Sequence, residues 1–203
     1  MKAVKGGPGK AAKIAKNVRA KTQQESKTEE NGLPFDYEAM KKGISQVESS
    51  GGINMKSPYS SATGLYGQLY GELGDSEYMK GKTRDEFAED IDLQNEIFDI
   101  RFNEGFEGIP SLKRNAYEVT EEYKDQLGDK WEFSLDEVAA LSNFLGRDGA
   151  RKYFASLRDG TKYVMPDNNK TPEESLEIYR AARDKSISDK NKSKRTFSFQ
   201  SNT

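Results

Sequence analysis

Several helix-start signals occur along the chain, and each precedes apolar residues at helical spacing. Thr83 with Glu86, and Ser134 with Glu137, have the spacing of a capping box, in which side chains and backbone satisfy each other at a helix N-terminus. Asp36 has the residue type and position of a helix N-cap. No segment shows a convincing alternation of apolar and polar residues, which a half-buried β-strand would need. We therefore expect a mainly α fold.

Glycine and proline separate the expected helices. The predicted helices run from Asp36 to Glu48, from Thr83 to Gly105, from near Ser111 after Pro110, and from Ser134 to Gly146. A short helix then ends at Gly160, and Thr171 and Pro172 open the last helix. A chain of 203 residues with this pattern fits one domain with extensions better than two full domains.

Charge is distributed unevenly along the sequence. Residues 1–21 contain seven basic residues and no acidic one, and residues 183–203 contain six basic and two acidic residues. The total formal charge is −2, so the residues between these ends are strongly acidic. We expect a basic arm at 1–32, a globular domain at 33–165, and a terminal helix with a polar, basic tail at 166–203. The ends are either solvated tails or docking arms for an acidic partner surface or nucleic acid.

The residue types that are missing narrow the chemistry. The chain contains no cysteine and no histidine, so thiolate or imidazole metal ligands and imidazole general bases are excluded. Chemistry performed by carboxylates remains, and glycoside cleavage is its leading case. The sequence contains no run of 18 apolar residues, so it predicts no membrane-spanning helix. The basic N-terminus lacks the apolar stretch of a secretory signal, so we expect another route if the protein acts outside the cytoplasm.

One motif places a carboxylate at the end of a helix. Residues 47–51 read Val-Glu-Ser-Ser-Gly, and residues 57–66 read Ser-Pro-Tyr-Ser-Ser-Ala-Thr-Gly-Leu-Tyr in a polar loop. Partial burial of Glu48 in the last helical turn would raise the pKa of its carboxyl, as a general acid near neutral pH requires. The following loop could offer backbone and hydroxyl donors to a sugar.

These motifs resemble the soluble lytic transglycosylase family, whose pattern runs Glu-Ser-Ser-Gly, then Ser-Pro, then Gly-Leu-aromatic-Gln. The form in this chain is most similar to the versions in bacteriophage virion proteins. Residues 139–154 resemble the phage variant of a later motif of the family, and the similarity covers about residues 35–160. The resemblance implies a lysozyme-like fold and cleavage of the glycan strands of peptidoglycan, with no metal or organic cofactor.

Site roles follow from the same resemblance. Glu48 would be the catalytic acid/base, Ser57 and Gln68 would line the sugar subsites, and Asn143 and Phe144 would face the glutamate. Aromatic side chains Tyr59, Tyr66 and Tyr70 would either stack on sugar rings or belong to the core. For Phe144, the alternative to a place in the site is a ring in the core. For Gln68, the alternative to a sugar contact is a loop amide with local hydrogen bonds.

The sequence departs from the family pattern at three places. Gly67 is inserted before Gln68, Gly52 and Ile53 stand where Asn-Pro is usual, and Asn143 stands where the family has tyrosine.

Three functions remain open at this stage. The first is a virion-associated transglycosylase that opens the cell wall for DNA entry, with the basic ends binding other virion proteins. The second is a structural virion or tail component that retains the fold without turnover. The third is a muramidase that hydrolyses with water, using Glu48 and a second carboxylate such as Glu72 or Asp75.

Overall fold

The computed structural model describes residues 33–58, 60–73, 77–79, 81–106, 108–165 and 170–200, without the side chains of residues 71, 72 and 194–200. The predicted arm at 1–32 therefore lies outside the described residues. Residues 35–203 form one unit. Among the described residues, no helix is long and apolar enough to cross a membrane.

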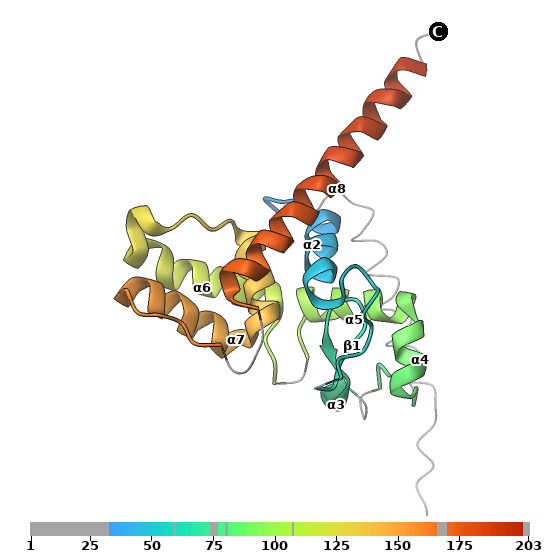
Figure 1. Cartoon of the computed structure of the whole chain (residues 1–203), viewed down its shortest axis with the longest axis horizontal. Helices are drawn as coiled ribbons and strands as arrows, with labels where there is room; N and C mark the ends of the chain where they lie inside the picture. The colour runs from blue at the N-terminus through green and yellow to red at the C-terminus, as the bar shows by residue number, and fades with distance from the viewer. Residues whose placement is uncertain are drawn as a thin grey trace, which may run out of the picture. The chain divides into compact units, whose positions relative to one another are not determined.

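The chain is mainly helical, as the sequence predicts (Figure 1). The elements, in order, are α2 (Tyr37–Ser49), β1 (Ala62–Thr63), β2 (Gln68–Leu69), α3 (Tyr70–Leu73), α4 (Arg84–Glu89), α5 (Ile91–Asn103), α6 (Leu112–Leu127), a 3-10 helix (Gly128–Lys130), α7 (Leu135–Asp159) and α8 (Pro172–Gln200).

The predicted helix starts are confirmed. The Asp36 carboxylate accepts a hydrogen bond from the amide of Ala39 at 3.1 Å and caps α2. Capping boxes open α4 and α7 at Thr83 and Ser134. At the start of α8, the Thr171 amide donates to the Glu174 carboxylate at 2.8 Å. Each of these caps joins partners three residues apart, so residue type and spacing in the sequence are enough to predict it.

The helix predicted from Thr83 to Gly105 is wrong as a single element, because the chain divides it at Asp90. The backbone of Asp90 leaves the helical region, and its carboxylate accepts a hydrogen bond from the Leu93 amide at 2.9 Å. Asp90 thus ends α4 and caps α5. The break predicted at Gly146 is confirmed: its φ of 69° interrupts α7.

A short hairpin was not expected from the sequence. β1 and β2 pair antiparallel, with Ala62 opposite Leu69 and Thr63 opposite Gln68. Strands of two residues are too short to show an alternating pattern, which is why the sequence gives no sign of them.

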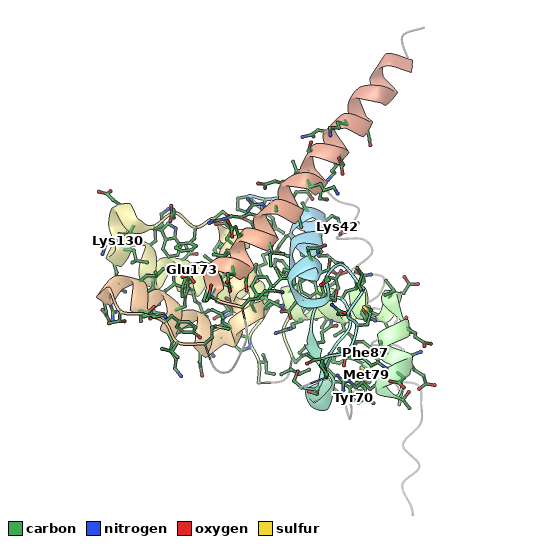
Figure 2. All side chains as sticks on the ribbon, in the orientation of Figure 1. Lys42, Tyr70, Met79, Phe87, Lys130 and Glu173 are labelled. Atoms are coloured by element: carbon green, nitrogen blue, oxygen red, sulfur yellow. The ribbon has the colours of Figure 1, made fainter. Side chains whose placement is uncertain are left out.

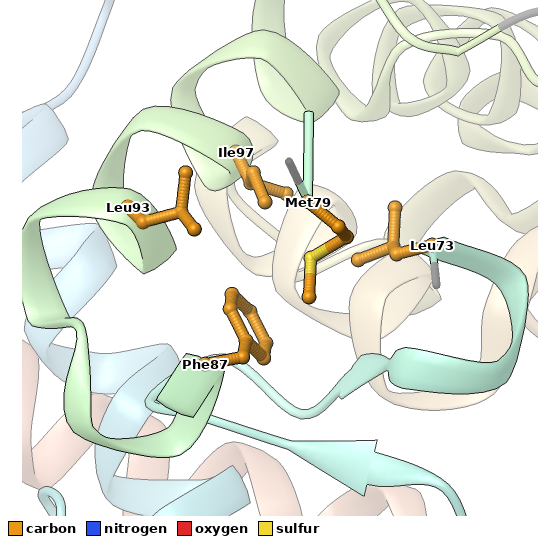
Figure 3. Close-up of a cluster of buried hydrophobic side chains, with 5 residues drawn as sticks. All are labelled: Leu73, Met79, Phe87, Leu93 and Ile97. Atoms are coloured by element: carbon orange, nitrogen blue, oxygen red, sulfur yellow. The ribbon is translucent and has the colours of Figure 1, made fainter. Parts of the chain in front are cut away.

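A small apolar cluster joins α3, the helix that follows the hairpin, to α4 and α5. Figure 3 shows its five side chains, which come from α3, the loop after it, α4 and α5: Leu73, Met79, Phe87, Leu93 and Ile97. Tyr70 packs against this cluster, and Figure 2 labels it beside Met79 and Phe87. The cluster thus holds α3, which directly follows β2, against α4 and α5.

Helix α8 packs across α2, while α6 and α7 lie side by side (Figure 1). A Cβ on Gly43 of α2 would lie 2.5 Å from the Tyr179 ring, so only glycine allows this close approach. Tyr179 is fully buried, and its hydroxyl donates to Asp136 at 2.7 Å. Arg183 also pairs with Asp136 at 2.8 Å. The region expected as a terminal helix and tail is thus helical through Gln200, and the first turns of α8 belong to the core.

Candidate active site

Glu48 lies in the last turn of α2, where the helix gives way to the loop that leads to β1. The helix ends at Ser49, and the residue after it, Ser50, caps it in a left-handed conformation with φ 54°. Ser49 is buried, and its hydroxyl donates to the carbonyls of Ser45 and Leu65 at 2.9 and 3.1 Å. The end of α2 is therefore tied to the turn between β1 and β2, which residues 64–67 form.

This turn contacts the Glu48 carboxyl directly. A Cβ built on Gly67 would overlap the Oε2 atom of Glu48 and lie 2.7 Å from its Cδ, and the φ of Gly67 is 62°. Both the space and the backbone conformation require glycine there. The glycine that departs from the family pattern thus allows the turn to pass over the carboxyl.

Asn143 reaches Glu48 from α7. Its Nδ2 donates to Glu48 Oε1 at 2.9 Å and lies 3.4 Å from the carbonyl oxygen of Tyr66. The amide therefore bridges the carboxyl and the turn. Asparagine supplies a donor to the glutamate at the position where the resembled family has tyrosine.

Burial sets the protonation of Glu48. Desolvation raises the pKa of the Glu48 carboxyl from its usual 4.5 to about 7, although part of the residue remains accessible to solvent. The positive charges of Arg101 and Lys170 and the hydrogen bond from Asn143 act in the opposite direction. Lys170 lies close to the helix end, with its Nζ donating to the carbonyl of Val47 at 3.4 Å. Near neutral pH the carboxyl can thus both donate and accept a proton.

This burial predicts a pH-dependent stability that needs no activity assay. The unfolded chain has a Glu48 pKa near 4.5, so between about pH 4.5 and 7 the folded state binds more protons. The free energy of unfolding contributed by Glu48 therefore falls as pH rises through this window. Glu48→Gln removes the charge, so the variant should exceed the wild type in stability at pH 8 by up to about 3 kcal/mol. Urea unfolding at pH 4.5 and 8 measures this, and an advantage that does not grow with pH would contradict it.

The other predicted sugar contacts have different places. Tyr66 contributes its backbone carbonyl to the site, and the residue is only 4% exposed. Its ring centroid lies 4.2 Å from that of Phe98, and its hydroxyl donates to Asn95 at 2.6 Å. Gln68 is 1% exposed, and its amide donates to the carbonyl of Gln94 at 3.2 Å. These two side chains serve the packing of the hairpin.

The described contacts of Ser57 and Phe144 are with residues other than Glu48. The Ser57 hydroxyl accepts from the Ser60 amide at 3.2 Å, and the Phe144 ring packs edge-on against Tyr179 at 6.4 Å. Tyr70 donates its hydroxyl to the Lys82 carbonyl, and Tyr59 lies outside the described residues. The structure therefore brings together Glu48, Asn143 and the backbone of Tyr66 and Gly67.

Arg84 is a residue that the sequence analysis missed. Its guanidinium donates to the Thr63 hydroxyl at 2.8 Å, and to the carbonyls of Ser57, Ser60 and Ala62 at 2.9 to 3.0 Å. It fixes the loop between Glu48 and the hairpin. No local pattern identifies it, because its partners lie 21 to 27 residues away.

Within the described part of the chain, no three acidic side chains lie close enough together to hold a metal ion. The side chain of Glu72, and Asp75 entirely, lie outside the described residues.

Comparison with known proteins found no match to this chain among family models, curated proteins or solved structures.

Proposed function

We propose that this chain cleaves the glycan strands of peptidoglycan as a lytic transglycosylase, with Glu48 as its single acid/base. The observation that carries the proposal is the environment of the Glu48 carboxyl. It lies between Asn143 and the turn at Gly67, and burial raises its pKa to about 7, while the Glu48 residue as a whole keeps some solvent exposure. General acid–base catalysis is most efficient when the pKa of the catalytic group lies near the working pH. The resemblance in the Glu48 and Asn143 motifs supplies the substrate class.

The reaction requires two proton transfers through one carboxyl. Protonated Glu48 donates its proton to the oxygen that joins N-acetylmuramic acid to N-acetylglucosamine, and the bond from that oxygen to the muramoyl C1 breaks. Carboxylate Glu48 then removes the proton from the muramoyl 6-hydroxyl, whose oxygen bonds to C1. A 1,6-anhydro ring results, no water is consumed, and Glu48 regains its proton.

Hydrolysis with two carboxylates is the alternative route, and its candidate second carboxylates, Glu72 and Asp75, lie outside the described side chains. Among the described side chains, the charged groups that act on its carboxyl are the cations Arg101 and Lys170. A hydrolase would need a second carboxylate as nucleophile or base close to the scissile bond.

Purified sacculi provide the test. Soluble fragments with 1,6-anhydromuramoyl ends are the expected product, identified by mass spectrometry after chromatography. Reducing muramoyl ends would identify a muramidase instead. No release at any pH from 5 to 8 would identify a structural component that keeps the site without turnover.

The proposed setting is a bacteriophage virion, in which the particle delivers the enzyme to the cell wall. The basic ends of the chain would bind other virion proteins, and nucleic acid is the alternative partner. This part of the proposal rests on the resemblance and on the charge distribution.

A further inference from the structure

The turn at residues 64–67 needs support from outside the hairpin. Each strand that flanks it has only two residues, so few strand hydrogen bonds hold it. Gly64 and Gly67 both have positive φ, and glycine loses more conformational freedom on folding than any other residue. A turn of this kind keeps its place against Glu48 only if other groups fix it.

Gln94, in the first turns of α5, supplies that support. Its side chain is fully buried, and its Oε1 accepts the amide hydrogen of Leu65 at 2.8 Å. Its Nε2 donates to the carbonyls of Phe87 and Ala88 at 2.7 and 3.0 Å. These carbonyls belong to the last turn of α4, so one amide joins the turn to the α4–α5 junction.

Packing around Gln94 strengthens this connection. A Cβ on Gly64 would lie 2.9 Å from the Cδ and Oε1 of Gln94, so the turn rests directly on the amide. The backbone carbonyl of Gln94 accepts the hydrogen bond from Gln68 on the other side of the turn. Gln94 thus holds both ends of the segment whose middle, Tyr66 and Gly67, contacts Asn143 and Glu48.

We propose that Gln94 is a positioning residue, which fixes the turn at residues 64–67 over the Glu48 carboxyl and thereby excludes water from it. Its importance for catalysis rests on the proposed function, whereas its effect on the carboxyl does not. Because the amide is neutral and acts through the backbone, it changes the solvation of Glu48 without adding a charge.

Loss of the turn would act on Glu48 in a defined direction. The groups that face the carboxyl are Asn143 from α7, Arg101 from α5 and Lys170 from the segment before α8, and all three favour its ionised form. Desolvation alone opposes them. If water enters where the turn now lies, the pKa of Glu48 must fall.

Two neutral variants of the full-length chain test this. Gln94→Met keeps the volume of the side chain but removes its acceptor and both donors. Gln94→Asn keeps the amide but is too short to reach Leu65 and both carbonyls at once. In each folded variant we expect the Glu48 pKa, measured by carbon-13 NMR titration of its carboxyl, to fall by about one unit or more, an approximately tenfold change in its proton affinity. The upper pH limit of sacculus cleavage should move down by the same amount.

Asn115→Leu is the matched control for lost stability. Asn115 is a buried amide on α6 that accepts a hydrogen bond from Arg151 at 2.7 Å, and it has no described contact with the turn or with Glu48. This variant should lower the melting temperature while leaving the Glu48 pKa unchanged.

The outcomes separate the two proposals. An unchanged Glu48 pKa in folded Gln94→Met or Gln94→Asn, or an equal shift in Asn115→Leu, overturns the role of Gln94. A wild-type chain that releases nothing from sacculi, with the pKa shift still present in the Gln94 variants, overturns the proposed function and leaves the positioning role intact.

Discussion

Replacing Glu48 with glutamine should lower the rate of sacculus cleavage by roughly 10² to 10⁴-fold, the usual contribution of general acid–base catalysis. Glutamine keeps the shape of the side chain and can still accept the hydrogen bond from Asn143, but it cannot donate a proton to the glycosidic oxygen. The rate of release of soluble muropeptides, measured at saturating sacculi, reports this loss. Substrate binding should change little.

Glu38→Gln is the matched control. Glu38 is exposed in the first turn of the same helix, so the substitution removes the same charge away from the site. It should leave cleavage close to the wild-type rate. Near-wild-type cleavage by Glu48→Gln would refute the assignment of the acid/base, and equal losses in both variants would point to a general effect of charge on binding.

Gly67→Ala should have the second largest effect, a loss in turnover of roughly 10²-fold, typical of a small misplacement of a catalytic group. A methyl group there overlaps the Glu48 carboxyl, so either the glutamate or the turn must move. The backbone φ of 62° adds strain, of about 1 kcal/mol, for any residue with a Cβ. The measurement is kcat on sacculi together with the melting temperature.

Gly160→Ala separates strain from displacement of the carboxyl. Gly160 has a similar φ of 65°, and a Cβ there meets no atom within 4 Å. Both variants should therefore lose the stability that backbone strain costs, Gly67→Ala should lose more because of the overlap, and only Gly67→Ala should lose turnover. If Gly67→Ala kept its kcat, the turn would not be fixed against Glu48.

Local interactions explain which parts of the fold the sequence predicts. The N-caps at Asp36, Thr83 and Ser134 join atoms three residues apart, so residue type and spacing identify them. The interruption at Gly146 follows from a single residue with positive φ. Asp90 shows the limit of this reasoning, because one residue both ends α4 and caps α5 inside a continuous apolar pattern.

The candidate site divides in the same way. Glu48 was selected because the motifs around it resemble those of the soluble lytic transglycosylase family, and its position in the last turn of an amphipathic helix is a local property that the sequence also predicts. Four further residues selected with it proved to have other contacts: the side chains of Tyr66 and Gln68 pack within the hairpin, Ser57 bonds to Ser60, and Phe144 packs on Tyr179. Residue type alone does not show which way a side chain points.

The sequence by itself determined the mainly α class and most of the helix starts, because each depends on neighbours within one or two turns, and a motif resemblance selected Glu48 as a candidate. Only the tertiary structure decided the environment of that carboxyl. Asn143 lies 95 residues from Glu48 in the sequence, and Gln94 lies 29 residues from Leu65. The pKa of Glu48 is a property of desolvation, which arises only when segments distant in the chain pack around one group.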